Sequence, residues 1–172
     1  MMRHSLLLAS FFLLSCIGLR AQKIVLIDMD YITENIPAYQ QANTQLEQLS
    51  KQYQQEIDGK GKEAETMYKE YQASASSLSA TARNKKEEAI VAKEKEIAEL
   101  RKAYFGPEGE LSKKQEELIA PIHDEIYQAV KQVAQQSGYD IVVDRASAQS
   151  IIFAQPRIDI SNLVLAKLGY IK

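Results

Sequence analysis

Sparse apolar residues at helical spacing run from Ile36 to Ala120, and this stretch constrains the fold most. They recur at steps of three and four in its first part and at steps of seven in its second part. A Ser- and Ala-rich segment, 74–81, separates the parts. Such narrow stripes predict two long helices folded back on each other as a coiled-coil hairpin. Thr33 or Asn35 is expected to cap the first helix, with Pro37 in its first turn, and the second helix is expected to begin near Thr81 or Asn84. The seam positions are Tyr39, Ala42, Leu46, Leu49, Tyr53, Ile57, Ala64, Met67, Tyr71, Leu78, Ile90, Ile97, Tyr104, Leu111 and Leu118.

Two glycines predict a flexible point in the first helix. The apolar spacing changes between Tyr53 and Ile57, a stutter that locally unwinds a supercoil. Gly59 and Gly61 follow it, and each costs about 1 kcal/mol relative to Ala in a helix interior. We therefore predict a hinge at Gly59 and Gly61.

A second hinge is predicted at Gly106 and Pro107. The Gly-Pro pair alone favours a break in the helix. However, Tyr104 and Leu111 keep the sevenfold phase of the preceding residues, and a change of direction would have no reason to preserve it. We therefore predict a kink within one long helix, with Pro121 as a further candidate kink.

The two chain ends, 23–35 and 121–172, are predicted to form a small β body from which an arm, 36–120, projects. Short apolar segments at 23–30, 139–144 and 150–154 predict three strands, the first with partners from the far end of the chain or from another chain. A last helix is predicted from Asp159 or Ser161, and Gly138 and Gly169 are predicted to end the two helices before them. Three short strands make a marginal core, so other subunits are expected to complete the sheet. The fold class is therefore α+β and mostly α. The predicted subunit-contacting residues are Ile24, Leu26, Ile141, Val143 and Ile152.

The first 22 residues are predicted to be a secretory signal peptide. A basic start is followed by a short apolar run, and cleavage is expected after Ala21 or Gln22. Alternatively, the sequence before Cys16 resembles a bacterial lipobox, which would leave Cys16 as a lipid-bearing first residue. Without Cys16 the mature chain has no cysteine, and export without disulfides favours a bacterial periplasm.

Charge and composition exclude several function classes. From Lys23 onward there are 19 basic and 23 acidic residues, a net charge of −4, with the signs interspersed, so nucleic acid is not an expected partner. No nucleophile–base arrangement or phosphate loop is visible, and no cofactor is expected. The five acids of the predicted body are interpreted as strand-end and capping residues rather than a metal or acid–base site: Asp28, Asp30, Asp140, Asp144 and Asp159.

Three parts of the mature chain carry a family resemblance: residues 23–29, the helix 126–135 with the strand 139–144 that follows it, and the closing segment 159–168. On these segments the mature chain resembles, from end to end, the Skp (OmpH-like) family of periplasmic chaperones. It implies a homotrimer whose helical arms enclose a cavity and hold unfolded outer-membrane proteins without ATP. Contact with membrane or lipopolysaccharide is a further implied possibility. Best-known members are strongly basic, whereas this chain is acidic.

The aromatic residues of the arm have two possible roles, seam packing or contact with unfolded chains. Tyr39, Tyr53, Tyr71 and Tyr104 fall in phase and are interpreted as seam residues. Tyr68 and Phe105 lie one residue off the seam, and with the adaptable Met67 they are the candidate client-binding residues. The alternative to a holdase is an envelope coiled-coil spacer or adaptor with one specific partner.

Overall fold

The computed structural model describes residues 22–148 and 150–171. Most of these residues are helical, as predicted. The chain divides into two compact units. We call residues up to Asp30 and from Ala129 onward the body unit, and Tyr31–Gln128 the arm unit. The predicted signal peptide, Cys16 included, lies outside the described residues except for Gln22, and the expected boundaries at 35/36 and 120/121 stay a prediction.

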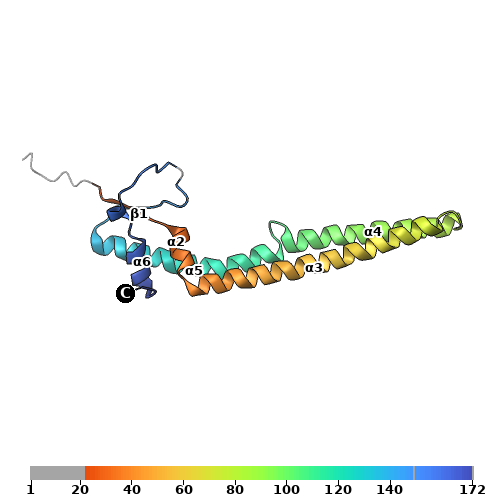
Figure 1. The fold of residues 1–172 in the computed structure, drawn as a ribbon, viewed down its shortest axis with the longest axis horizontal. Coiled ribbons are helices and arrows are strands. Elements are labelled where there is room, and N and C mark those ends of the chain that lie inside the picture. Colours follow the sequence, from red (N-terminus) through yellow and green to blue (C-terminus); the bar gives the residue numbers. More distant parts are fainter. Residues whose placement is uncertain (1–21, 149, 172) are drawn as a thin grey trace, which may run out of the picture. The chain divides into compact units, whose positions relative to one another are not determined.

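The arm unit is a helical hairpin (Figure 1). Helix α3 (Pro37–Ser74) and helix α4 (Ala80–Phe105) lie side by side, joined by a short turn at the predicted Ser/Ala-rich tip. The 38 residues of α3 correspond to about 57 Å at about 1.5 Å per residue. Pro37 occupies the first turn, as predicted, because its missing N–H has no helical partner there.

The predicted helix starts were partly wrong. Helix α2 (Met29–Glu34) precedes α3, so the first strand is shorter than expected, and neither Thr33 nor Asn35 caps α3, whose N-cap is Ile36. The return helix starts at Ala80 rather than Thr81 or Asn84. It is capped by Ser79, whose hydroxyl accepts the N–H of Ala82 at 3.2 Å.

The prediction of one continuous return helix was also wrong. Helix α4 ends at Phe105, a loop of four residues follows, and helix α5 (Glu110–Ser137) begins after it. The Gly106 N–H closes α4 on the Lys102 carbonyl at 2.9 Å, and the Gly109 N–H bonds to the Gly106 carbonyl at 2.9 Å. After this compact loop the chain again packs against α3, so Tyr104 and Leu111 keep their sevenfold spacing although the helix is interrupted between them. Pro121 lies inside α5 without ending it.

The body unit contains a parallel pair of strands, β1 (Ile24–Ile27) and β2 (Ile141–Asp144), with Ile24 opposite Ile141. A single bridge from Leu26 to Asp159 occupies the other edge of β1, where the Ile160 N–H bonds to the Leu26 carbonyl at 2.8 Å. The first strand therefore finds its partners at the far end of the chain, one of the two sources expected. Helix α6 (Ser161–Leu168) follows this bridge. Buried apolar residues of the unit are Val25, Leu26, Ile27, Ala129, Val133, Ile160, Val164 and Leu165.

The predicted third strand at 150–154 is not formed. Its described residues are in a turn and irregular conformation before a short 3-10 helix, η1 (Pro156–Ile158). Both edges of β1 are occupied, by β2 and by the Asp159 bridge, whereas the outer edge of β2 pairs with no strand among the described residues. Ile152 and Phe153 are exposed, so within the single chain no apolar packing favours pairing this segment with β2.

Glycines end both helices of the body unit, as predicted. Gly138 has a φ of 67° after α5, and the Tyr139 N–H bonds back to the Ala134 carbonyl at 2.9 Å. Gly169 has a φ of 87° after α6. This left-handed region disfavours side chains, and the bond from Tyr139 is the one that closes a Schellman C-cap.

Candidate functional site

Aromatic residues pack across the arm hairpin next to the α4–α5 loop. The rings of Tyr53 and Tyr104 stack with centroids 3.9 Å apart, and Phe105 meets Tyr53 edge-on at 6.2 Å. Tyr53 donates to Glu110 at 2.7 Å, and Tyr104 donates to Glu56 at 2.8 Å. The hydrogen bond to the Glu110 carboxylate is the main cause that raises the pKa of Tyr53 to about 12. These two bonds link both sides of the loop to α3.

The other two predicted seam tyrosines also contact the facing helix. Tyr71 donates its hydroxyl to Glu87, which raises the pKa of Tyr71 above its usual value. Tyr39 stacks on His123 of α5 with ring centroids 6.4 Å apart. The seam interpretation of these tyrosines is confirmed. Sequence reasoning missed the carboxylate partners, although glutamates are frequent in both helices.

The candidate client-binding residues differ in how much of each side chain is exposed to solvent. Tyr68 is 50% exposed, Met67 is half-buried, and Phe105 is 39% exposed while its ring packs against Tyr53. Val91, which sequence reasoning did not select, is also exposed on α4. An assignment of client contact to these side chains stays a prediction.

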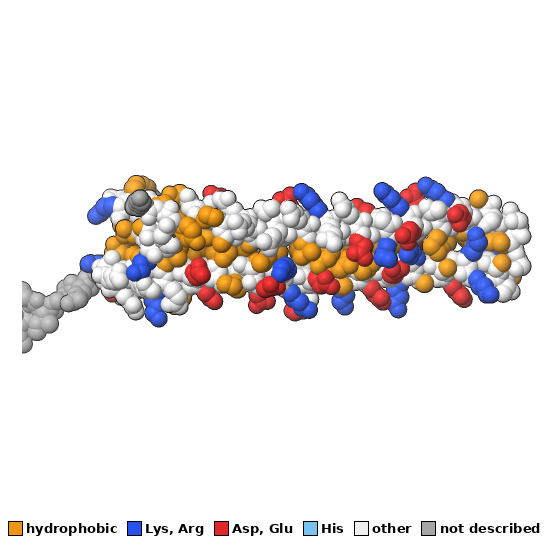
Figure 2. All heavy atoms as spheres, turned by 90° about the horizontal axis from the view of Figure 1, so that it is seen from below, with side chains coloured by type: hydrophobic (Ala, Val, Ile, Leu, Met, Phe, Trp, Pro, Cys, Tyr) orange, Lys and Arg blue, Asp and Glu red, His pale blue; other side chains and the backbone are white. Residues whose placement is uncertain are grey.

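Charged side chains dominate the rest of the arm surface. Figure 2 shows orange side chains in a stripe between the two helices, with red and blue side chains intermingled over and around it. Ion pairs cross the hairpin between Lys60 and Glu96 at 2.6 Å and between Lys93 and Glu63 at 2.7 Å. No helix of the described residues is long and apolar enough to cross a membrane.

The hinge glycines have different surroundings. A Cβ at Gly59 or Gly61 would meet no other atom within 4 Å, and α3 runs through both positions without a break. A Cβ at Gly106 would lie 2.4 Å from the Lys102 carbonyl oxygen. Pro107 lies in the loop beside it. Alanine can therefore stiffen the backbone at Gly59 and Gly61, but at Gly106 it would displace the end of α4.

Apolar side chains also remain exposed in the body unit. Ile24 and Ile141, which face each other in the strand pair, are both exposed, and Val143 is half-buried. Ile152 is 98% exposed, and its neighbour Phe153 is also exposed. Leu26, by contrast, is buried within the chain itself. Four of the five residues predicted to contact other subunits therefore retain accessible apolar surface.

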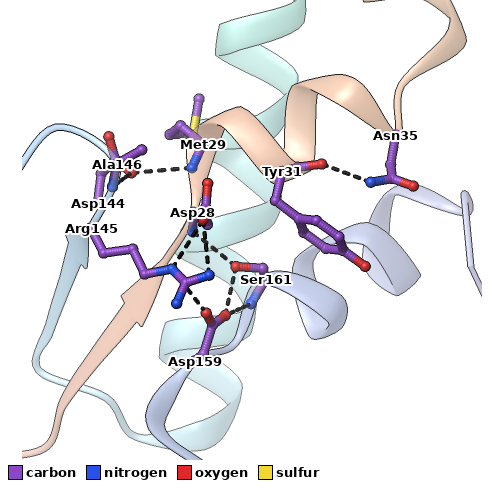
Figure 3. A network of polar contacts seen from close by, with 9 residues as sticks. All are labelled: Asp28, Met29, Tyr31, Asn35, Asp144, Arg145, Ala146, Asp159 and Ser161. Atoms are coloured by element: carbon purple, nitrogen blue, oxygen red, sulfur yellow. Dashed lines mark hydrogen bonds and ion pairs between the residues drawn. The ribbon is translucent and has the colours of Figure 1, made fainter. Parts of the chain in front are cut away.

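Acids of the body unit join the end of β1, the end of β2 and the start of α6 around one arginine (Figure 3). Arg145 pairs with Asp28 at 2.9 Å and with Asp159 at 3.3 Å. Asp159 accepts the N–H and hydroxyl of Ser161 at 2.9 and 2.6 Å, and Ser161 in turn accepts the Asp28 N–H at 2.9 Å. Among the described residues no group of acids or histidines is arranged to hold a metal ion. The bonds of Asp28 and Asp159 fit the strand-end and capping roles expected of them, whereas sequence reasoning missed the role of Arg145.

Asp144 gives this network a predicted pH dependence. Burial would raise its pKa, but hydrogen bonds from Ser147 and from the N–H groups of Met29 and Ala146 leave the pKa below its usual value. Because the pKa of Asp144 is lower in the folded state, its ionised carboxylate stabilises the fold at pH values above the unfolded-state pKa of about 3.9. This stabilisation is lost as the pH falls through the folded-state pKa.

We expect Asp144→Asn to lower the free energy of unfolding at pH 7 by roughly 0.5–1.5 kcal/mol. The difference from the unmodified protein should shrink below about pH 4, where the aspartate becomes protonated. Urea unfolding at several pH values measures this. Asp140→Asn, which alters an exposed bond to the Lys23 N–H, is the control. A constant difference across the pH range would contradict the assignment.

A family model described as outer membrane protein (OmpH-like) matches residues 23–168. The chain belongs to the OmpH-like family. Chaperone protein Skp of Yersinia enterocolitica is 28% identical over 151 residues, which cover 88% of this chain and 88% of that protein. Chaperone protein Skp of Pectobacterium atrosepticum is 26% identical over 148 residues, covering 86% of each. The resemblance noted from the sequence is thereby confirmed.

A solved OmpH-like structure from Caulobacter crescentus CB15 shares the fold. The TM-score is 0.67 at 16% sequence identity, covering 88% of this chain and 86% of that one. This likeness confirms the predicted class of long helices with a small strand body. OmpH-like proteins are chaperones rather than enzymes, and family membership supports a chaperone role for this chain.

Proposed function

We propose that this OmpH-like protein is an ATP-independent holdase chaperone. Three copies would associate through their body units, and their helical arms would enclose a cavity that holds unfolded outer-membrane proteins. The observation that carries the proposal is the arm hairpin, whose helices are joined by their own tyrosine–glutamate hydrogen bonds and lysine–glutamate ion pairs. Such an arm keeps its shape while its outer residues contact other chains. The predicted signal peptide would place it in the periplasm.

The exposed apolar residues of the body unit support association of copies. Ile24, Ile141, Ile152 and Phe153 are all exposed in the single chain. Burial of apolar area contributes about 25 cal/mol per Å², so covering these side chains with other copies is favourable. Two paired strands alone are marginal, which is a further reason for a shared core.

Holding through weak contacts fits the arm surface. Isolated exposed residues such as Tyr68 and Val91 offer small apolar contacts among charges. Each would contribute little, so a client is released when its own folding becomes more favourable. No nucleotide is needed for such a cycle, which is set by competing free energies.

Aggregation assays with several clients test the proposal. A holdase should keep several unrelated unfolded β-barrel proteins soluble and leave folded proteins unbound. The opposite outcome, capture of one folded envelope protein with no protection of any unfolded one, would instead establish the spacer or adaptor function.

Tyr68→Ala is expected to weaken client holding without weakening the fold. The side chain is half exposed, so its removal should change the free energy of unfolding by less than about 0.5 kcal/mol. Client dissociation, followed by fluorescence, should become faster by roughly two- to tenfold, which corresponds to about 0.4–1.4 kcal/mol. Gln72→Ala, an exposed polar change on the same helix, is the control. Equal dissociation rates for the two variants would remove Tyr68 from the client surface.

The pair Gly59→Ala and Gly61→Ala tests the predicted hinge in α3. Neither Cβ meets a neighbour, so each substitution should stabilise the helix by about 0.5–1 kcal/mol. A stiffer arm should adapt to fewer client sizes, and we expect weaker capture of large β-barrels than of small ones. Unchanged capture of both sizes, with the expected gain in stability, would rule out a hinge there.

A further inference from the structure

Four charged residues form a cluster at the middle of the arm hairpin. Lys60 and Glu63 come from α3, and Lys93 and Glu96 come from α4. Lys60 pairs with Glu96 at 2.6 Å, while Lys93 pairs with Glu63 at 2.7 Å and with Glu96 at 3.2 Å. Two of these three bonds cross between the helices, so the cluster holds α3 and α4 to each other.

The two lysines occupy seam positions. In α3, Lys60 lies three residues after the buried Ile57 and four residues before the half-buried Ala64. In α4 Lys93 stands three residues after the buried Ile90. The Lys93 side chain is only 17% exposed. The Glu63 and Glu96 carboxylates therefore replace part of the water that would surround the ammonium group of an exposed lysine.

The apolar seam residues beside the cluster, Ala64 on α3 and Ile97 on α4, are only half-buried. The buried isoleucines of the hairpin, Ile57 and Ile90, come before the cluster on their own helices and so lie at opposite ends of it, because α3 and α4 run antiparallel. On α3 the neighbours of Lys60 are Gly59 and Gly61, where even an added Cβ would touch nothing within 4 Å. Ion pairs therefore join the two helices at this level, whereas stacked rings join them at Tyr53 and Tyr104.

The glutamates remain accessible to salt. The side chain of Glu63 is 62% exposed. Dissolved ions therefore reach one side of the cluster, and attraction between partly exposed charges weakens as the screening length shortens.

We propose that Lys60, Glu63, Lys93 and Glu96 form a salt-sensitive clasp, and that the arm helices separate first at this level when ionic strength rises. The tyrosine level, held by ring stacking and hydrogen bonds, stays closed under the same conditions. The clasp determines where along the arm the two helices first separate. This separation depends on ionic strength and does not require a bound client.

Hydrogen exchange of the full-length protein without client tests the clasp. Raising NaCl from about 0.1 M to about 1 M shortens the screening length from about 10 Å to about 3 Å. We expect amide exchange in 57–64 and 90–97 to accelerate several-fold, while 49–54 and 100–105 change by less than twofold. A uniform response along the hairpin, or none at 57–64 and 90–97, would overturn the proposal.

Three variants separate the clasp from general salt effects. The double variant Lys60→Met and Lys93→Met should abolish the acceleration of exchange by salt at this level, because only the like charges of Glu63 and Glu96 remain there. Glu63→Gln, which keeps the shape of an exposed side chain, should reduce the salt response and remains usable if the double variant does not fold. Lys69→Met removes an exposed pair with Glu65 within α3 and should leave the response unchanged. A full response in Glu63→Gln, or a lost one in Lys69→Met, would overturn the clasp without bearing on the proposed holdase.

Discussion

Leu165→Ala should lower the free energy of unfolding of the protein by about 2–5 kcal/mol, the range typical of a buried leucine truncated to alanine. Leu165 is 0% exposed, and its backbone carbonyl also accepts the N–H of Tyr170 after α6. Truncation would remove apolar contacts and leave a cavity in the small core of the body unit. Urea unfolding, followed by circular dichroism at one protein concentration, measures the loss.

Leu163→Ala is the matched control, because Leu163 lies on the same helix α6 and is 51% exposed. We expect it to change the free energy of unfolding of the isolated chain by less than about 0.5 kcal/mol. Equal losses for the two variants at low protein concentration would contradict the burial assigned to α6. A loss for Leu163→Ala that grows with protein concentration would instead place Leu163 in a contact between copies.

Gly109→Ala should destabilise the junction between α4 and α5. A Cβ at this position would lie 2.7 Å from the Tyr104 carbonyl oxygen and 2.9 Å from that of Ala103. Both neighbours are backbone atoms and cannot rotate away, so we expect a cost of roughly 1–3 kcal/mol, as for other overpacked sites. Thermal unfolding and hydrogen exchange across 100–112 measure it, with the fastest exchange expected next to the loop.

Gly61→Ala is the control for the junction, since its Cβ would meet no atom within 4 Å. This variant should keep or raise the thermal stability while Gly109→Ala lowers it. If Gly109→Ala were as stable as the unmodified protein, the description of a tight loop between α4 and α5 would be contradicted. The single kinked helix that the periodicity predicted would then be favoured.

Periodicity predicted the parts of this fold that depend on local sequence. The steps from Tyr39 to Tyr71 were enough to place a long helix and its seam, because a narrow stripe has to face a partner helix. Gly138 and Gly169 marked helix ends correctly, because left-handed backbone is selective for glycine. The family resemblance supplied the chaperone role, which periodicity alone could not.

Features that depend on distant contacts were not predictable in this way. Whether 150–154 forms a strand depends on pairing and packing with segments distant in the sequence, which the sequence does not reveal. The break at Gly106 was hidden because a compact loop can preserve the apolar phase. The clasp was missed for a related reason: Lys60 and Lys93 do not look like seam residues until the facing glutamates are known.

Mass measurement with and without an unfolded β-barrel client tests the central claim most directly. Native mass spectrometry or light scattering on the mature chain should give an assembly of three copies, and adding the unfolded client should give three copies with one client. Folded client should leave the mass unchanged. A single copy whose mass does not change when unfolded client is added would contradict the proposed holdase.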